Sequence, residues 1–181
     1  GQAADITPYV NSTTVPTLAD IAPSSMKAVT AGKTLYGLPT SNYTQGLIYN
    51  RKLFSHAGLN PDQPPTTWAQ VRADARIITQ KTGKPGYVEM AKNDNTAGWI
   101  LTTVAYSLGG RMEKGIGTHA KATLNNKYTI KALGMLKTMR WTDNSMGSNF
   151  DLGWSDINQA FAAGQVGMYI SGSDVYTNLV Q

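Results

Sequence analysis

The sequence predicts an α/β fold in which helices pack around a mixed or parallel sheet. Two observations lead to this prediction. Short stretches of β-favouring residues alternate with helical stretches through most of the chain. The 181 residues are 41% hydrophobic and 15% charged, which is enough apolar material for a buried core. The length suits one domain, or one lobe of a larger protein.

Four segments are expected to be strands because β-branched and aromatic residues gather in them between turn residues. They are residues 33–39, 46–50, 85–91 and 166–171. The polar stretch between the first two, residues 40–45, is expected to be a loop.

Helices are expected between these strands. The clearest begins after Thr67, a good N-cap residue, and stops at Gly83. A short helix should start at Pro23 and end before Gly32. Others are expected at 51–57, at 126–140, from Ser155 as N-cap to about residue 163, within 93–110 after a polar loop, and from about residue 172 onward.

Apolar spacing predicts which side chains face the core. In the helix at 126–140 the inward residues should be Ile130, Leu133, Leu136 and Met139. Three tryptophans are expected to be core residues, namely Trp68, Trp141 and Trp154. Trp99 lies beside the apolar stripe of its own helix and therefore need not be a core residue.

Composition and missing motifs exclude several classes of protein. The chain has no cysteine and only two histidines, which argues against thiol catalysis, disulfides and a metal site. The net charge is +5, but the basic residues are scattered and form no stripe with aromatics, so no nucleic-acid partner is expected. The patterns of a nucleophile elbow, a phosphate-binding loop and a zinc protease are absent.

The start of the sequence shows no signal peptide, and no apolar run is long enough to span a membrane. Either the protein is cytosolic, or a targeting segment lies outside this sequence. Loop carboxylates leave a glycosidase open as an alternative, although solvated acids and helix caps explain them better. The acids in question are Asp94, Glu113, Asp143, Asp151, Asp156 and Asp174.

A series of short motifs in a fixed order carries a resemblance. The motifs are YGLP at 36–39, GLIYN at 46–50, PPTTW at 64–68, a tryptophan-bearing helix that ends in Gly-Gly, and AFAAGQVGMYISGS at 160–173. Together they resemble the carbohydrate-type extracytoplasmic solute-binding proteins of bacterial ABC importers, the group that includes maltose-binding protein. The resemblance covers about residues 18–176.

The resemblance implies a periplasmic-binding-protein-like fold of type II, with two lobes that close on a sugar by a hinge motion. Residues 1–43 would be the end of the first lobe and the crossing strand, and residues 44–181 an incomplete second lobe. The sequence is therefore expected to be cut from a longer protein at both ends.

The resemblance also implies a binding protein and not an enzyme, with no catalytic residue, metal or cofactor. Its partners would be a sugar or oligosaccharide and the ABC importer permease. It would work in the periplasm or as a cell-surface lipoprotein, with membrane contact only through a lipid anchor or permease docking. Two alternatives stay open, a carbohydrate-active hydrolase and a sugar sensor on the same fold.

Sugars expose flat C–H faces that stack on aromatic rings, and hydroxyls that bond to amides and carboxylates. Three places offer such groups: the crossing loop, the start of the tryptophan-bearing helix, and the turn after the last strand. The candidate ligand-binding residues are Asn42, Tyr43, Thr44, Asn95, Trp99, Ser173 and Asp174.

Each candidate also has a purely structural interpretation. Tyr43 could cap a sheet edge and Asn42 could make a turn. Ser173 or Asp174 could cap the last helix. Many members of the resembled group carry a tryptophan where Asp174 stands, so the stacking ring there is missing unless Tyr176 replaces it.

Overall fold

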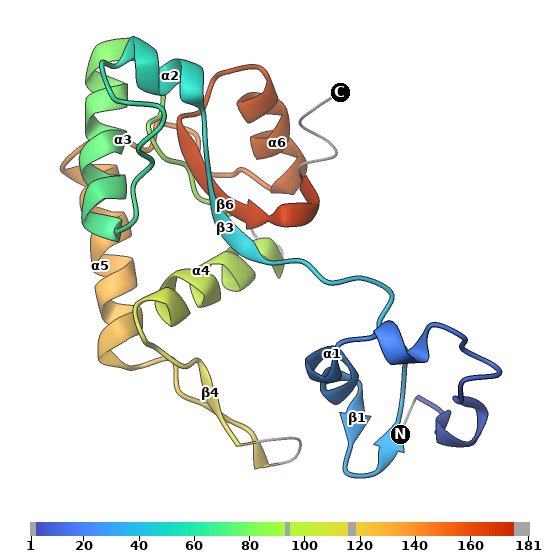
Figure 1. Ribbon diagram of the computed structural model, residues 1–181. Coiled ribbons are helices and arrows are strands. Elements are labelled where there is room, and N and C mark those ends of the chain that lie inside the picture. The colour runs from blue at the N-terminus through green and yellow to red at the C-terminus, as the bar shows by residue number, and fades with distance from the viewer. Residues whose placement is uncertain (1–2, 93–94, 116–118, 176–181) are drawn as a thin grey trace. The chain divides into compact units, whose positions relative to one another are not determined.

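The computed structural model describes residues 3–92, 95–115 and 119–175. The chain divides into two compact units, Gly1–Thr44 and Gln45–Gln181 (Figure 1). This division lies one residue from the predicted boundary between 43 and 44. That the units belong to a first and a second lobe stays a prediction.

The first unit is small and built from short elements. It contains the 3-10 turns η1 (Thr7–Tyr9) and η2 (Leu18–Asp20), the helix α1 (Pro23–Ala28), and the strands β1 (Thr30–Ala31) and β2 (Thr34–Leu35). β1 and β2 pair antiparallel. Gly32, with φ +64°, lies in the turn between them, so it does not end the helix as predicted.

The strand expected at 33–39 is shorter than predicted, since only Thr34–Leu35 pair with β1. Leu35 is also bonded to residues near the N-terminus. Its N–H donates to Thr7 Oγ1 at 2.8 Å, and its carbonyl accepts the Ile6 N–H at 2.9 Å.

The second unit is built on two antiparallel strands, β3 (Gln45–Tyr49) and β6 (Met168–Gly172), which lie side by side in Figure 1. Their register pairs Gln45 with Gly172 and Leu47 with Ile170. Every residue of β6 is buried, whereas β3 is mostly half-buried. β6 is thus the central strand and β3 an outer one.

The strand predicted at 85–91 is not formed, although the segment runs beside β6. The Gly167 N–H donates to the Pro85 carbonyl at 2.9 Å, and the Val88 N–H donates to the Met168 carbonyl at 3.0 Å. Between these two bonds, the Gly86 and Tyr87 N–H groups both turn to the Ser145 carbonyl. A regular ladder cannot continue through residues whose donors are used elsewhere.

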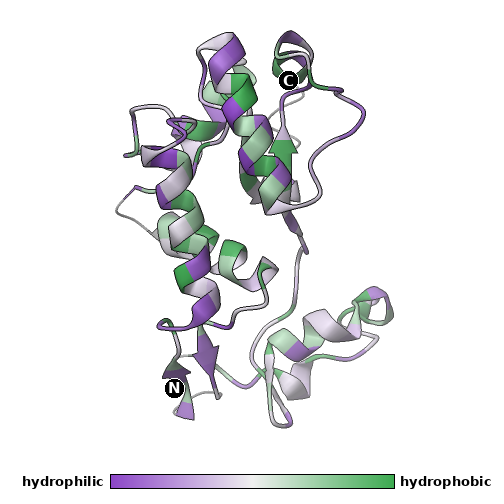
Figure 2. Ribbon diagram, turned by 90° about the vertical axis from the view of Figure 1, so that its left-hand side faces the viewer, coloured by the Kyte–Doolittle hydropathy of each residue, from purple (hydrophilic) through white to green (hydrophobic). Residues whose placement is uncertain are grey.

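In the described part of the second unit, five helices surround these segments. They are α2 (Arg51–His56), α3 (Trp68–Thr82), α4 (Asn95–Ser107), α5 (Lys127–Trp141) and α6 (Trp154–Ala162). Figure 2 shows apolar and polar positions mixed along them, as expected for helices with one face on a core. None of the helices within the described ranges has the length and apolar character needed to cross a bilayer.

The ends of α3 confirm the prediction from local sequence. Thr67 and Gln70 form a capping box, and Gly83 closes the helix with φ +70°. The cap of α6 was predicted wrongly. Gly153, not Ser155, is the N-cap residue, and its N–H donates to Asp156 Oδ2 at 2.9 Å. Between α4 and α5, β4 (Glu113–Lys114) and β5 (Lys121–Ala122) pair antiparallel.

The inward face of α5 was predicted only in part, since Met139 is buried and Leu136 packs against the core as expected, but Ile130 and Leu133 do not. Thr129, Ala132 and Met139 are buried, whereas Ile130 is 60% and Leu133 is 50% exposed. Because Thr129 and Ala132 are small, this face packs closely against α4.

Trp141, predicted to be in the core, is 66% exposed, and the Arg140 guanidinium lies 4.4 Å from its ring centre.

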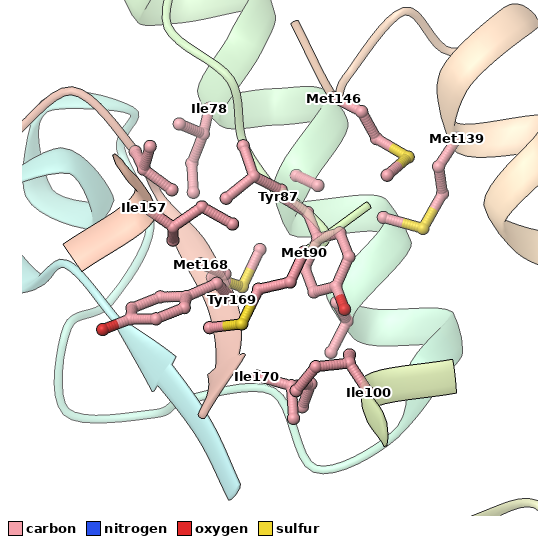
Figure 3. Packing of buried hydrophobic residues seen from close by; sticks show 14 of the residues in the cluster. Ile78, Tyr87, Met90, Ile100, Met139, Met146, Ile157, Met168, Tyr169 and Ile170 are labelled. Carbon is pink, nitrogen blue, oxygen red and sulfur yellow. The ribbon is translucent and has the colours of Figure 1, made fainter. Parts of the chain in front are cut away.

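The core of the second unit joins the helices to β6 and the 85–91 segment. Figure 3 shows its large side chains packed together, among them Ile78, Tyr87, Met139 and Met168. Trp68 and Trp154 pack against this cluster as predicted. The Trp68 ring meets Tyr87 edge-on at 6.1 Å, and its indole N–H donates to Ser107 Oγ at 2.8 Å.

Two glycines allow the 85–91 segment to pass between α3 and β6. A Cβ added at Gly86 would collide with the Ala75 carbonyl group of α3. A Cβ added at Gly167 would lie 2.6 Å from the Gly86 carbonyl oxygen. The close packing of three backbones here therefore requires glycine.

This crossing gives a stability prediction. Gly86→Ala should lower the free energy of unfolding by at least about 2 kcal/mol, because backbone must move to admit the methyl group. Gly134→Ala on α5 is the matched control, since its added Cβ meets no atom within 4 Å. The control should raise stability by about 0.5–1 kcal/mol through helix propensity. Urea denaturation measures both, and equal effects would contradict the packing argument.

Candidate functional site

Three chain segments meet at one edge of the sheet in the second unit. Gln45 begins β3 and is paired with Gly172, the last residue of β6. The 85–91 segment runs in the same direction as β6, since Pro85 bonds to Gly167 and Val88 to Met168. Its end therefore reaches the edge where β6 ends, and α4 follows it. Ligands of open α/β sheets bind at such an edge.

Ser173 and Asp174 lie at this edge in a 3-10 turn, η4 (Ser173–Val175). Both are exposed, whereas the neighbouring Val175 is buried in the core. The buried valine holds the turn in place, so a hydroxyl and a carboxylate are presented at the surface. Tyr176, considered as a replacement stacking ring, lies outside the described residues.

Trp99 and Trp154 form an aromatic pair near the same edge. Their ring centres are 5.6 Å apart with the planes tilted by 39°. Trp154 follows Leu152, whose carbonyl accepts the Ala91 and Lys92 N–H groups at 3.1 and 3.2 Å. The loop before α6 is thereby tied to the end of the 85–91 segment. Both rings are half-buried against the core and half open to solvent.

The remaining candidate of this unit is Asn95, the first residue of α4. Asn93 and Asp94, which precede it in the predicted polar loop, lie outside the described residues.

Sequence reasoning missed Gln45 as a member of this group. Its side-chain Oε1 accepts a hydrogen bond from the Thr103 hydroxyl on α4. Thr103 Oγ1 also lies 3.2 Å from the Trp99 carbonyl oxygen, one helical turn earlier. The only available signal was a polar residue at the first position of a strand, and that signal does not reveal a partner 58 residues away.

The other three candidates belong to the first unit. Asn42 Nδ2 donates to the hydroxyl of Ser25, a buried residue of α1, at 2.7 Å. Tyr43 is 53% exposed, and Thr44 is exposed as well. The amide of Asn42 thus has a local structural bond, and the contact of these residues with a ligand stays a prediction.

Some of the carboxylates that kept a hydrolase open have structural partners. Asp143 forms a two-pronged ion pair with Arg72, at 2.5 and 2.9 Å, which lowers the pKa of the carboxyl. Asp156 caps α6. Within residues 3–92, 95–115 and 119–175, no three His, Cys, Asp or Glu side chains are grouped as metal ligands.

A pocket of the second unit lies elsewhere. Its volume is about 660 Å³, with Leu47 and Ile170 of the sheet, Trp68 of α3 and Met135 of α5 among its mostly apolar lining. None of the candidate residues in the described ranges lines it.

Glu89 is a buried acid close to this edge. The residue as a whole is half-buried, but its Oε1 is shielded from solvent and has no hydrogen-bond partner among the described groups. Oε2 accepts the Tyr87 hydroxyl at 2.5 Å. Burial raises the pKa of Glu89 to about 7, although the tyrosine bond opposes the shift. The pKa of Tyr87 is raised as well, mainly by burial and secondly by the negative charge of the Glu89 carboxylate.

The buried acid predicts a pH dependence of stability. The pKa of Glu89 rises on folding from 4.5 to about 7, so its stabilising contribution is present at low pH and is lost as pH rises through 7. The loss should approach about 3 kcal/mol. Glu89→Gln should remove this part of the pH dependence. Urea denaturation at about pH 5 and about pH 8 measures it, with exposed Glu113→Gln as the control. An unchanged pH profile in Glu89→Gln would contradict the assignment.

Comparison with known proteins shows which proteins this chain is similar to. A family model described as bacterial extracellular solute-binding protein matches residues 1–180. The arabinooligosaccharide-binding protein of Bacillus subtilis is 33% identical over 106 residues, which are 58% of this chain and 22% of that protein. The sn-glycerol-3-phosphate-binding periplasmic protein of Yersinia enterocolitica is 31% identical over 112 residues, 58% of this chain and 24% of that protein.

Solved structures of the same kind share the fold. The ABC transporter solute-binding protein of Thermotoga lettingae, bound with alpha-D-tagatose, matches with a TM-score of 0.84 and 25% identity, over 98% of this chain and 44% of that one. The cyclic alpha-maltosyl-1,6-maltose binding protein of Arthrobacter globiformis matches with a TM-score of 0.75 and 26% identity, over 96% of this chain and 42% of that one.

The match thus spans about a quarter of the curated relatives and less than half of the solved structures. The predicted periplasmic-binding-protein-like α/β fold is confirmed as part of that larger fold. Because the family model matches almost the whole sequence, the chain belongs to the bacterial extracellular solute-binding protein family.

Proposed function

We propose that the protein binds a sugar or oligosaccharide outside the cytoplasmic membrane and delivers it to the permease of an ABC importer. The observation that carries the proposal is the sheet edge of the second unit. An aromatic pair, a hydroxyl and a carboxylate stand at or near this edge, on segments far apart in the sequence. These are the groups that sugar recognition requires.

The chemistry of the edge favours a neutral polyhydroxy ligand. An aromatic ring at Trp99 offers a flat face for sugar C–H groups, and Asp174 offers acceptors for hydroxyls. A carboxylate repels the phosphate group of an ester ligand. The names of two relatives point the same way, since they bind an arabinooligosaccharide and a maltose-type sugar, whereas other relatives are named for sn-glycerol-3-phosphate.

In the proposed mechanism the ligand is held in an interlobe cleft that closes by hinge motion. Asn42, Tyr43 and Thr44 supply contacts from the first unit, and Asn95, Trp99, Ser173 and Asp174 from the second. The ligand stabilises the closed state only through contacts that are stronger there than in the open state. No covalent step is involved, so the protein acts as a binding protein and not as an enzyme, as the names of its relatives suggest.

The proposed place of action is extracytoplasmic, in the periplasm or on the cell surface as a lipoprotein, in line with the description of the family. Besides the sugar, the partner is the membrane permease, which receives the ligand from the closed form.

A thermal-shift screen tests the proposal. One class of mono- or oligosaccharide should raise the Tm of the full chain, because ligand binds the folded state alone. Trp99→Ala should weaken binding of that sugar about tenfold or more through the lost stacking surface. Polyols and phosphate esters belong in the same screen, since a phosphate ester that binds best would contradict the sugar assignment.

The matched control is Trp141→Ala, which removes a 66% exposed tryptophan on α5 outside the candidate site. Its affinity, measured by calorimetry, should equal that of the parent chain. Equal losses in both variants would mean that Trp99 acts only through stability. Because Trp99 packs on the core, Trp99→Phe is measured as well, and it should keep the fold and part of the affinity.

A further inference from the structure

We propose that Gln45 is a further ligand-contacting residue of this site, and that Thr103 holds its side-chain amide in position. The proposal rests on the proposed function and adds one more hydrogen-bond donor to the predicted residue set. It depends on where Gln45 lies, on what its carbonyl oxygen does, and on what its amide nitrogen is left to do.

The backbone fixes Gln45 at the sheet edge. It is the first residue of β3, and its register partner Gly172 directly precedes Ser173 and Asp174. An antiparallel pair brings facing Cα atoms within about 5.5 Å of each other. Gln45 therefore starts from a point next to the turn that presents the hydroxyl and the carboxylate.

The side chain of Gln45 extends from the strand to α4. Its Oε1 accepts the Thr103 hydroxyl, whose oxygen is also 3.2 Å from the Trp99 carbonyl. Alternation along β3 puts Gln45 on the same face as Leu47, which points toward the α3–α5 side of the sheet. Thr103 thus holds the amide oxygen at α4, one helical turn after Trp99.

The hydrogen bond from Thr103 occupies only the oxygen of the Gln45 side-chain amide. A glutamine side chain has one acceptor oxygen and an NH₂ group with two donor hydrogens. The oxygen is engaged by Thr103, and the nitrogen donates to no group in the described part of the chain. Gln45 is half-buried, so its orientation is restricted while ligand can still reach it.

The NH₂ donor of Gln45 complements the acceptor oxygens of Asp174. Asp174 accepts hydrogen bonds only, whereas the NH₂ of Gln45 donates. A sugar hydroxyl is both donor and acceptor, so one hydroxyl can donate to a carboxylate and accept from an amide. A fixed amide beside Asp174 would therefore select for a hydroxyl at that position of the sugar.

The test measures affinity in the full chain by calorimetry, using the sugar that gives the largest thermal shift. Gln45→Ala and Gln45→Glu should each weaken binding about tenfold, because both remove the donor. Gln45→Glu keeps an acceptor for Thr103 and so separates the ligand contact from the structural bond. Thr103→Val, which keeps the shape, should cost only about threefold by loosening the amide. Gln80→Ala, at an exposed position of α3, is the control and should have no effect.

A second measurement does not depend on the folding of any variant. The side-chain NH₂ signal of Gln45 in the ¹⁵N spectrum of the parent chain should shift when sugar is added. An unshifted signal, or unchanged affinity in Gln45→Glu, overturns the contact. If Trp99→Ala loses affinity while Gln45→Glu keeps it, only this contact fails. If no sugar binds the parent chain, the proposed function fails and the contact with it.

Discussion

The backbone crossing at Gly86 is the constraint on which the second unit depends. Here the 85–91 segment passes between Ala75 of α3 and Gly167 before β6, without room for a Cβ at either glycine. The Ser145 carbonyl accepts the N–H groups of both Gly86 and Tyr87, so the segment is tied to the turn after α5 as well. These contacts set the direction of the segment along β6. They therefore decide where it ends and where α4 begins.

The candidate site follows from this geometry because its polar groups stand at the ends of elements whose other residues are buried. Val175 is buried beside Ser173 and Asp174, and Ile100 is buried beside Trp99. Packing thus orients the turn and the helix before any ligand arrives, which reduces the ordering cost of binding. The buried Glu89 is likewise held by its surroundings, but here the burial lowers the stability of the fold. An acid placed just inside the edge is held largely by Tyr87, at a cost in stability that grows with pH.

Local sequence patterns correctly predicted the helix ends that depend on residues close together in the chain. The N-cap at Thr67 and the stop at Gly83 are of this kind. Predictions were wrong where residues far apart in the sequence determine the local structure. The donors of residues 86 and 87 are taken by Ser145, and α5 turns its small residues inward so that α4 can approach. Gln45 was missed for the same reason, because its partner Thr103 lies 58 residues away.

The division of the candidates between two units has an energetic consequence under the proposed function. Contacts from Trp99, Asp174 and Gln45 belong to one unit, so they are available whether the protein is open or closed. Such contacts raise the affinity of both states equally and do not shift the balance between them. Closure must then be driven by groups that reach the ligand only in the closed state, a role assigned here to Asn42, Tyr43 and Thr44. Affinity and closure are thus controlled by different residues, and a substitution in one unit need not affect both.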